Sequence, residues 1–198
     1  MVKAITFDLD GVYFTENSFS RFKNSLPVSD LTKLDFLSKS ESMMSFKRGE
    51  LTEDQFWDIA RQEIGIDLSN QQIFELMYQA YEVNQDVVDY VKKVRSQGIK
   101  TCICTNNFPT RINAVGKKFD FLSDFDVQVF SYEVGSVKPD PKIFQTLIDR
   151  SEVLPEEIFY ADDKEANVIS AKSLGINAIV YTTFEDFVQK LQSFSIIV

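Results

Sequence analysis

Hydrophobic residues change their spacing twice along the chain. Residues 2–7 form a short β-rich run that leads directly into two acids, Asp8 and Asp10. From about residue 15 to residue 84, apolar residues recur at helical spacing and show no strand alternation. After residue 84, short apolar runs alternate with amphipathic segments. The pattern therefore predicts a helical insert between the first strand and the rest of an alternating strand–helix chain.

The insert carries clear helix signals. Thr52 and Gln55 have the spacing of a capping box, which predicts a helix start at this point. Phe56 and Ile59 follow at helical spacing, and a second amphipathic segment is expected near residues 70–81. We expect this region to be entirely helical.

The remainder of the chain predicts a parallel sheet covered on both faces, because strands and helices alternate throughout. This is a doubly wound, Rossmann-like α/β fold. Its predicted core comprises residues 1–14 and 85–198, and the helical insert comprises residues 15–84. Expected strands lie at 100–105, 127–130, 157–161 and 177–181, and expected helices at 86–97, 107–118, 163–174 and 184–192, with a further helix capped by Asp140.

Composition narrows the possible functions. The chain has 198 residues, of which 44% are hydrophobic, which suits one medium core with a modest insert. The formal charge of -9 argues against nucleic-acid partners, because an acidic surface repels the phosphate backbone. A signal peptide and a long uncharged stretch are not seen, so we expect a soluble, cytoplasmic protein without membrane partners. The oligomeric state is left open.

The chain contains no histidine. This excludes Ser-His-Asp and Cys-His catalysis, histidine zinc sites and histidine acid–base chemistry. Cys102 and Cys104 alternate along a predicted strand and are expected to be buried free thiols. An enzyme with this sequence must use carboxylates, lysine, hydroxyls, thiols or a metal bound by oxygen.

Polar residues follow each predicted strand of the core. Ligands of open parallel sheets bind outside the carboxyl ends of the strands, so these residues are expected to converge. Crowded acids repel one another unless a cation lies among them, and Mg²⁺ prefers oxygen ligands. The set predicts Mg²⁺ and a phosphorylated substrate. It consists of Asp8 and Asp10, then Thr105 and Asn106, then Lys138, and finally Asp162 and Asp163.

These residues also carry a family resemblance. Residues 7–12 resemble the first motif of haloacid dehalogenase superfamily phosphatases, Asp-x-Asp-x-(Thr or Val). Thr105 and Asn106 end a strand as in the second motif, residues 131–144 resemble the third, and residues 159–167 resemble the fourth. The match keeps the order of the motifs and covers the whole chain.

The resemblance implies a role for each residue. Asp8 would attack phosphorus and form an aspartyl-phosphate. Asp10 would protonate the leaving alkoxide and then activate water. Thr105 and the backbone N–H of Asn106 would bind phosphoryl oxygens. Lys138 would neutralise phosphate charge and hold Asp8 in place.

The same resemblance implies a Mg²⁺ site. Asp162 would bind the cation together with Asp8 and the backbone carbonyl of Asp10. Asp163 would support Lys138 or a metal-bound water, or would only cap the following helix. Asn167 is expected to be structural.

The insert stands where this superfamily places its helical cap. Residues 47–52 resemble the short cap of bacterial phosphatases that act on sugar phosphates such as α-D-glucose 1-phosphate. Lys47 or Arg48 could reach a substrate, although a solvated cap surface is the favoured interpretation. The resemblance implies a Mg²⁺-dependent phosphatase of small phosphomonoesters, sugar phosphates first.

Three alternatives remain in view. A haloacid dehalogenase is disfavoured by Asp10, because that reaction needs no second acid in the first motif. A phosphomutase keeps Asp10, but the Thr-x-x-x-His sequence of the β-phosphoglucomutase type is missing. A retired phosphatase fold used for binding is disfavoured by the intact set of acids, since an unused cluster of acids only costs stability.

Overall fold

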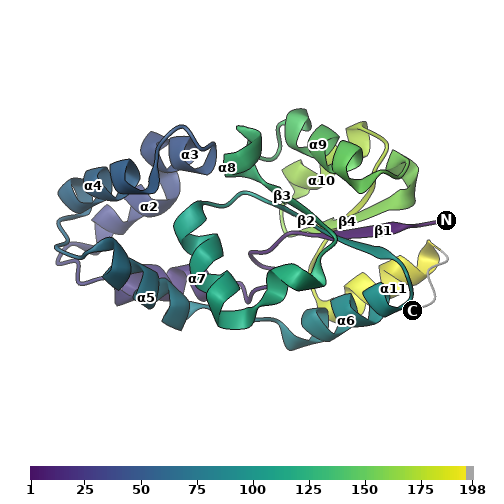
Figure 1. Ribbon diagram of the computed structural model, residues 1–198, viewed down its shortest axis with the longest axis horizontal. Helices are drawn as coiled ribbons and strands as arrows, with labels where there is room; N and C mark the ends of the chain where they lie inside the picture. The colour runs from purple at the N-terminus through teal and green to yellow at the C-terminus, as the bar shows by residue number, and fades with distance from the viewer. Residues whose placement is uncertain (195–198) are drawn as a thin grey trace.

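The computed structural model describes residues 1–194, and its core is a parallel five-stranded sheet (Figure 1). The strand order is β3-β2-β1-β4-β5, with the first strand in the centre. The predicted doubly wound α/β fold is therefore confirmed. The strands are β1 (Ala4–Phe7), β2 (Lys100–Thr105), β3 (Val127–Phe130), β4 (Ile158–Asp162) and β5 (Asn177–Val180).

The strand register brings the functional strand ends together. Phe7, the last residue of β1, pairs with Ile103 of β2 and with Ala161 of β4. Because the three strands are parallel, the segments that follow them emerge at one edge of the sheet. This edge carries the polar residues that the sequence predicts to form the active site.

Helices cover both faces of the sheet, as expected for a parallel sheet with apolar strands (Figure 1). Two helices, α9 (Pro141–Ser151) and α10 (Glu165–Ser173), pack on one face. The other face is covered by α6 (Gln85–Ser96), α7 (Pro109–Phe119) and α11 (Phe184–Ser193), and three short elements complete the core: η2 (Phe121–Asp124), α8 (Ser131–Val134) and η3 (Pro155–Glu157).

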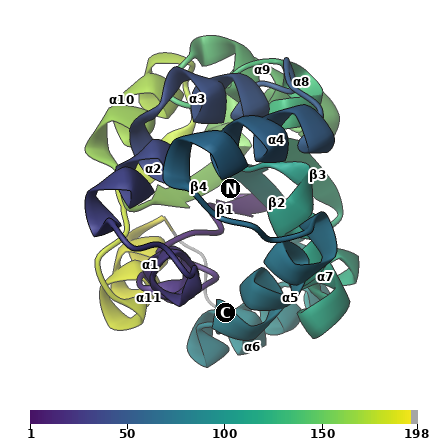
Figure 2. The ribbon, with the colours of Figure 1, turned by 90° about the vertical axis from the view of Figure 1, so that its left-hand side faces the viewer.

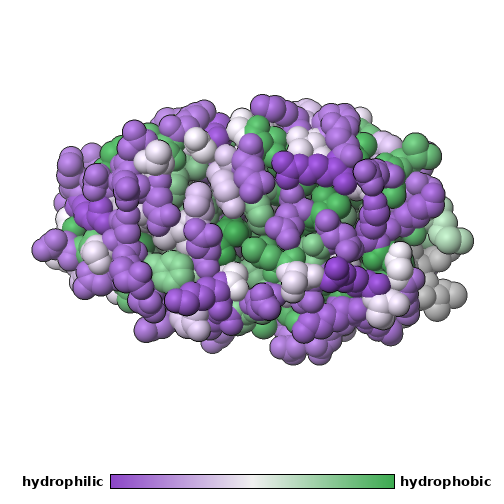
Figure 3. Space-filling model, in the orientation of Figure 1, coloured by the Kyte–Doolittle hydropathy of each residue, from purple (hydrophilic) through white to green (hydrophobic). Residues whose placement is uncertain are grey.

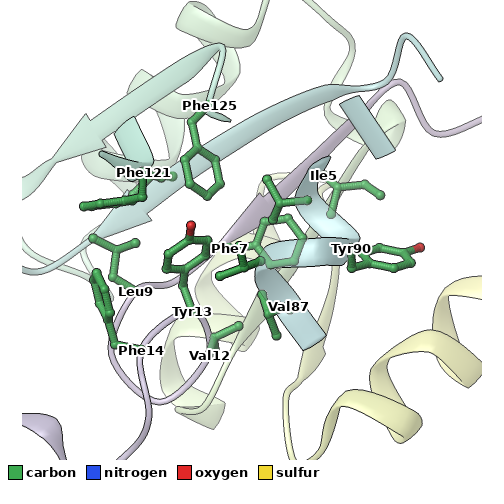
Figure 4. Packing of buried hydrophobic residues seen from close by; sticks show 14 of the residues in the cluster. Ile5, Phe7, Leu9, Val12, Tyr13, Phe14, Val87, Tyr90, Phe121 and Phe125 are labelled. Atoms are coloured by element: carbon green, nitrogen blue, oxygen red, sulfur yellow. The ribbon is translucent and has the colours of Figure 1, made fainter. Parts of the chain in front are cut away.

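An aromatic cluster fixes the segment after β1 (Figure 4). Phe7 is fully buried and contacts Phe125 and Phe187 with ring centroids 6.4 and 5.7 Å away. Tyr13 contacts Phe121 and Phe125 at 5.3 and 5.4 Å. Each such buried ring stabilises the fold by about 1.5–3 kcal/mol. The backbone that carries Asp8 is thus anchored on both sides by core residues.

A hydrophobic cluster that lies mostly in the insert includes Phe22, Phe46, Phe56, Trp57 and Met77, and Phe108 and Ala114 of the core also belong to it. Figures 1 and 2 show the helices of the insert grouped beyond the carboxyl ends of the strands. The capping box at the start of α4 is confirmed. The helical elements are α1 (Ser18–Ser25), η1 (Leu31–Asp35), α2 (Phe36–Lys39), α3 (Glu41–Lys47), α4 (Glu53–Ile64) and α5 (Asn70–Ala80).

The chain enters and leaves the insert through two neighbouring segments. Phe14 and Val83 form an antiparallel bridge, and the Asn84 N–H donates to the Tyr13 carbonyl at 2.8 Å. A buried hydrogen bond of 2.9 Å from Trp57 Nε1 to Thr110 Oγ1 also joins the insert to α7. The insert is therefore joined to the core by these paired connections and by a direct side-chain contact.

Two helix starts differ from the sequence prediction. The helix expected from residue 107 begins at Pro109, because the Asn107 N–H donates to Ser131 Oγ and Phe108 is extended. The helix expected from Asp163 begins at Glu165 with Lys164 as N-cap. Its start is displaced because the Lys164 N–H donates to the Asp162 carboxylate.

Hydrophilic side chains cover most of the face in Figure 3. Among the described residues, no helix combines the length and apolar character that crossing a bilayer requires.

Candidate active site

A cavity of about 340 Å³ lies between the carboxyl edge of the sheet and the insert. Other hollows among the described residues have similar volumes of about 320 to 370 Å³, so volume alone does not select this site. The lining residues do, because they include the strand-end acids. The core contributes Asp8, Asp10, Gly11, Asn106, Arg111, Lys138, Asp163 and Lys164, and the insert contributes Glu16, Phe19, Ser20, Ser38 and Lys47.

Asp8 is the first residue after β1 and is 4% exposed. Its Oδ1 accepts a hydrogen bond from the Leu9 N–H at 2.7 Å and lies 3.0 Å from Lys138 Nζ. Burial raises the pKa of Asp8 to about 6, with the charge of Lys138 opposing the rise and those of Asp162 and Asp10 adding to it. Asp8 is therefore a buried carboxylate that one lysine does not fully compensate.

Lys138 is a buried cation at the centre of the site. Its Nζ donates to the Cys104 carbonyl at 2.9 Å, to Tyr160 Oη at 3.0 Å and to Asp162 Oδ2 at 2.6 Å. Burial alone would lower the pKa of Lys138, but the charges of Asp8 and Asp162 outweigh it and raise the pKa. Lys138 thus stays protonated and forms an ion pair with Asp8, while the role at the phosphate that the resemblance implies for it stays a prediction.

Asp162 ends β4 and has no solvent exposure. Its carboxylate accepts hydrogen bonds from Lys138, from the Tyr160 hydroxyl, from the Lys164 N–H at 2.8 Å and from Asn167 Nδ2 at 2.9 Å. Burial would raise the pKa of Asp162, yet Lys138 and these hydrogen bonds lower it to about 2. Asn167 orients Asp162, which agrees with the structural role expected for it.

The loop that carries Lys138 is fastened to the end of β2 by Asn106. The Asn106 side chain accepts from the Lys138 N–H at 2.7 Å and donates to the Lys138 carbonyl at 2.9 Å. The sequence did not indicate this use of the side chain. Thr105 is buried at the end of β2, with its Oγ1 3.4 Å from Asn107 Nδ2. Phosphate binding by Thr105 and the Asn106 backbone stays a prediction.

Three carboxylates form a possible cation site. Oxygens of Asp8, Asp162 and Asp163 lie within 4.8 Å of one another. Gly11 adopts a positive φ of 78°, and a Cβ at this position would lie 3.3 Å from Asp163 Oδ2. Burial raises the pKa of Asp163, as it does that of Asp8. The donor set therefore fits a hard divalent cation, which prefers oxygen ligands and would relieve the repulsion.

Asp163 is placed differently from one of the two expectations. It does not cap the following helix, because Lys164 occupies that position. Its carboxylate instead belongs to the three-acid group, so it can bind a cation directly. The expected metal-ligand set of Asp8, Asp10 and Asp162 stays a prediction, and Asp163 is a candidate for the same set.

Asp10 has a partner that sequence reasoning missed. Its carboxylate forms an ion pair with Arg111 Nη1. The Arg111 side chain is 2% exposed, and its guanidinium carbon lies 4.2 Å from the Phe19 ring centroid and 4.6 Å from that of Phe108. A signal was present, because positions 108, 111, 112 and 115 form one apolar helical stripe in which Arg111 is the charged member.

Lys47 also lines the cavity, from the end of α3. The Lys47 side chain is half-buried. Its pKa falls to about 8, mainly because burial disfavours the charged form and also because the charge of Arg111 repels it. Arg48 instead forms ion pairs with Glu41 at 2.6 Å and Glu50 at 2.7 Å. The favoured interpretation of both residues as solvated cap surface is therefore wrong for Lys47.

Comparisons with known proteins find similar hydrolases and phosphatases. The model of the haloacid dehalogenase-like hydrolase family matches residues 2–175. The chain is 28% identical over 208 residues to D-ribitol-5-phosphate phosphatase of Bacteroides thetaiotaomicron, covering 96% of this chain and 97% of that protein. It is also similar to a magnesium- and phosphate-bound HAD family enzyme from the same organism, with a TM-score of 0.78 and 24% identity over 94% of this chain and 98% of that one.

Other relatives are longer. Bifunctional epoxide hydrolase 2 of Mus musculus is 25% identical over 201 residues, which cover 90% of this chain but 36% of that protein. The chain therefore corresponds to about one third of that larger protein.

Proposed function

Because the chain belongs to the haloacid dehalogenase-like hydrolase family, we propose that it is a Mg²⁺-dependent phosphatase of small phosphomonoesters that works through an aspartyl-phosphate on Asp8. The observation that carries this proposal is the placement of Asp8. Lys138 holds it at 3.0 Å, and it shares a three-carboxylate group with Asp162 and Asp163.

The proposed metal ligands are carboxylate oxygens of Asp8, Asp162 and Asp163, with the Asp10 carbonyl added by the family resemblance. The magnesium and phosphate bound to the similar Bacteroides enzyme support this assignment. Mg²⁺ would supply positive charge that offsets the repulsion between Asp8 and an incoming phosphate. Lys138, which is buried beside Asp8, supplies a second positive charge.

Asp8 acts as the nucleophile, and Asp10 acts first as the general acid and then as the general base. An Asp8 oxygen attacks phosphorus, the bond from phosphorus to the ester oxygen breaks, and Asp10 gives its proton to that oxygen. In the second step Asp10 takes a proton from water, which attacks the aspartyl-phosphate and releases inorganic phosphate. General acid–base assistance of this kind contributes about 10²- to 10⁴-fold in rate.

The proposed substrate class is a sugar or sugar-alcohol phosphate. The cavity of about 340 Å³ is at the small end of ligand pockets, which suits a compact molecule. Its wall includes the polar side chains of Glu16, Ser20 and Ser38, which can hydrogen-bond hydroxyl groups. The name of the similar Bacteroides relative, D-ribitol-5-phosphate phosphatase, points to the same class.

We assign residues 15–84 to a cap that covers the site, and residues 1–14 and 85–194 to the core that performs the chemistry; residues 195–198, which the sequence also assigns to the core, lie outside the described residues. Support comes from the hydrophobic cluster that lies mostly within the insert, and from the contribution of Lys47 and Phe19 to the cavity. A cap in this position excludes water and selects the leaving group.

The test is phosphate release from D-ribitol 5-phosphate and from p-nitrophenyl phosphate. Wild-type protein should release inorganic phosphate with Mg²⁺ and lose activity in EDTA. Asp8→Asn should lower kcat at least about a hundredfold, because an amide is a poor nucleophile. The control is Asp149→Asn on the exposed side of α9, which should retain full activity.

The competing functions give different results in the same assay. A binding protein shows no turnover in the wild type. A phosphomutase interconverts phosphate esters without net release of inorganic phosphate. Turnover by Asp8→Asn near the wild-type rate would exclude the covalent mechanism.

A further inference from the structure

We propose that Arg111 is a positioning residue that holds the Asp10 carboxylate toward the leaving group. The proposal rests on the proposed phosphatase function. Asp10 and Arg111 are 101 residues apart in the sequence and meet at the wall of the cavity. Nothing in the four family-like motifs includes Arg111.

The first observation is that Arg111 determines how Asp10 is held. The Asp10 side chain is 33% exposed, and within residues 1–194 its carboxylate accepts its one hydrogen bond from Arg111 Nη1. Asp10 precedes Gly11, whose positive φ of 78° turns the chain sharply away. Without Arg111, the carboxylate would be free to rotate in the solvent-accessible part of the cavity.

The second observation is that Arg111 itself cannot move easily. Its guanidinium lies over the rings of Phe19 at 4.2 Å, Phe108 at 4.6 Å and Tyr81 at 5.6 Å. Within the described part of the chain, Arg111 Nε is buried without a hydrogen-bond partner. A buried guanidinium that loses its carboxylate leaves an uncompensated charge, which is strongly unfavourable. The aromatic enclosure therefore keeps Arg111 directed at Asp10.

Arg111 also stabilises the charge that Asp10 acquires during proton transfer. When the proton of Asp10 passes to the leaving oxygen, Asp10 becomes a carboxylate, and the permanently charged guanidinium stabilises it. Arg111 keeps its own protons throughout. This stabilisation grows as the transfer proceeds, and interactions that strengthen toward the transition state accelerate the step. The effect should therefore be large where leaving-group protonation limits the rate.

The enclosure also couples Arg111 to the insert. Phe19 belongs to α1 of the insert, whereas Phe108 precedes α7 of the core. The guanidinium is thus held by aromatic rings from both units. Displacement of the insert would remove one ring and loosen the support of Asp10.

The test is a double-mutant cycle of Asp10→Asn and Arg111→Met, read with an alkyl ester, D-ribitol 5-phosphate, and an activated aryl ester, p-nitrophenyl phosphate. Arg111→Met should lower kcat at least about tenfold on the alkyl ester and less than about threefold on the aryl ester, whose leaving group needs little protonation. The double variant should be no slower than Asp10→Asn alone, because both changes remove the same function. Arg111→Lys should recover part of the alkyl activity.

Equal losses on the two esters, or additive losses in the double variant, would overturn the proposal. If Arg111→Met does not fold, Phe19→Ala retains Arg111 and removes one ring, and it should show the same selective loss on the alkyl ester. An equal loss there would again contradict it. A wild-type protein without turnover contradicts the phosphatase function itself, whereas an active wild type with equal losses contradicts only the role of Arg111.

Discussion

Two buried acids share one lysine in this site, and the sharing is unequal. Lys138 Nζ lies 2.6 Å from Asp162 Oδ2 and 3.0 Å from Asp8 Oδ1. Asp162 also receives several hydrogen bonds, and its pKa falls to about 2, whereas burial raises the pKa of Asp8 to about 6. The negative charge of Asp8 is therefore less well compensated than that of Asp162. A cation bound beside Asp8 and Asp163 would supply the missing positive charge.

From this we predict that protons and Mg²⁺ compete for Asp8. The raised pKa of Asp8 means that the metal-free folded protein binds a proton there below about pH 6 and releases it above. Mg²⁺ binds the ionised carboxylate, so its affinity should be highest above about pH 7 and fall toward tenfold per pH unit below 6. Isothermal titration calorimetry with Mg²⁺ at about pH 5 and about pH 7.5 measures this difference.

Asp8→Asn is the control for this competition. The variant keeps Asp162 and Asp163, so it should bind Mg²⁺ more weakly and with a smaller dependence on pH. An affinity of the wild type that does not change between the two pH values would show that Asp8 is not the competing group.

At the residue scale, the sequence predicts the site residues that follow strands. It does not predict the contacts of residues whose partners come from distant segments. Asp8, Lys138 and Asp162 converge as expected, because parallel strands end at one edge. Arg111 lies on a helix and acquires its partner only when α7 meets the loop after β1. The Asn106 side chain is similar, since its bonds to Lys138 depend on a loop 32 residues away.

At the scale of elements, the turn between α3 and α4 packs tightly against the core. Gly49 in this turn has a φ of 71°, and a Cβ there would lie 2.2 Å from the Tyr132 carbonyl oxygen of α8. Gly65, which ends α4, has nearly the same φ of 72° with nothing within 4 Å of such a Cβ. The two glycines differ in surroundings and not in backbone strain.

This pair allows a matched prediction. Gly49→Ala and Gly65→Ala should each cost about 1–2 kcal/mol of stability from the left-handed backbone. Only Gly49→Ala should also push the turn away from Tyr132 and misplace Lys47 next to it. We expect kcat/KM to fall at least about tenfold for Gly49→Ala and to stay within about twofold for Gly65→Ala, since small displacements are costly in catalysis.

Thermal melts and steady-state kinetics of the two variants provide the measurement. Similar values of kcat/KM at similar stability would mean that contact of this turn with the core does not matter for the site.

Lys47 and Arg48 give a second matched pair, on α3 and the turn that follows. Lys47→Met should raise KM for a phosphate monoester about tenfold, because the substrate loses a cation at the cavity wall. Arg48→Met should leave KM within about twofold, since exposed ion pairs such as those with Glu41 and Glu50 contribute little.

The pKa of Lys47 adds a pH signature. Because burial lowers that pKa to about 8, Lys47 loses its charge as the pH rises through this value. KM of the wild type should therefore increase above about pH 8, and the increase should be missing in Lys47→Met. The pH dependence of KM in both proteins is the measurement, and an identical rise in the two would assign it to another group.

Elements were predicted well where the signal is local. The four later strands lie within one residue of the predicted bounds, because short apolar runs between turns define them. The short helices between Ser18 and Lys47 were not resolved individually, since a helix of one or two turns carries too few positions to show a period. The predicted starts of α7 and α10 were too early. The helices begin at Pro109 and Glu165 because of tertiary hydrogen bonds that the sequence does not reveal.

At the scale of the whole molecule, the insert and the core enclose the site between them. Figure 2 shows the helices of the insert in front of the sheet edge. The paired connections at Phe14 and Val83 bring both ends of the insert to one place, which suits movement of the insert as a unit. Contacts at Gly49 and at Trp57–Thr110 lie away from those connections and hold the insert against the core.

Enclosure of the site limits which substrates can reach Asp8. The reacting phosphate must reach Asp8, which is 4% exposed, through a cavity of about 340 Å³ that Phe19 and Lys47 of the insert help to close. A sugar phosphate fits such a space, whereas a phosphate on a folded protein or a nucleic acid cannot enter without displacing the insert. The formal charge of -9 acts in the same direction, because polyanions are repelled before they arrive.

We therefore expect kcat/KM for D-ribitol 5-phosphate to exceed that for a phosphoserine peptide by at least about a hundredfold, the scale on which positioning effects operate. Added salt separates the two causes, because screening reduces charge repulsion and leaves steric exclusion unchanged. A preference that persists at high salt assigns the selection to the insert, and a phosphopeptide hydrolysed as well as the sugar-alcohol phosphate would show that the insert does not restrict access to Asp8.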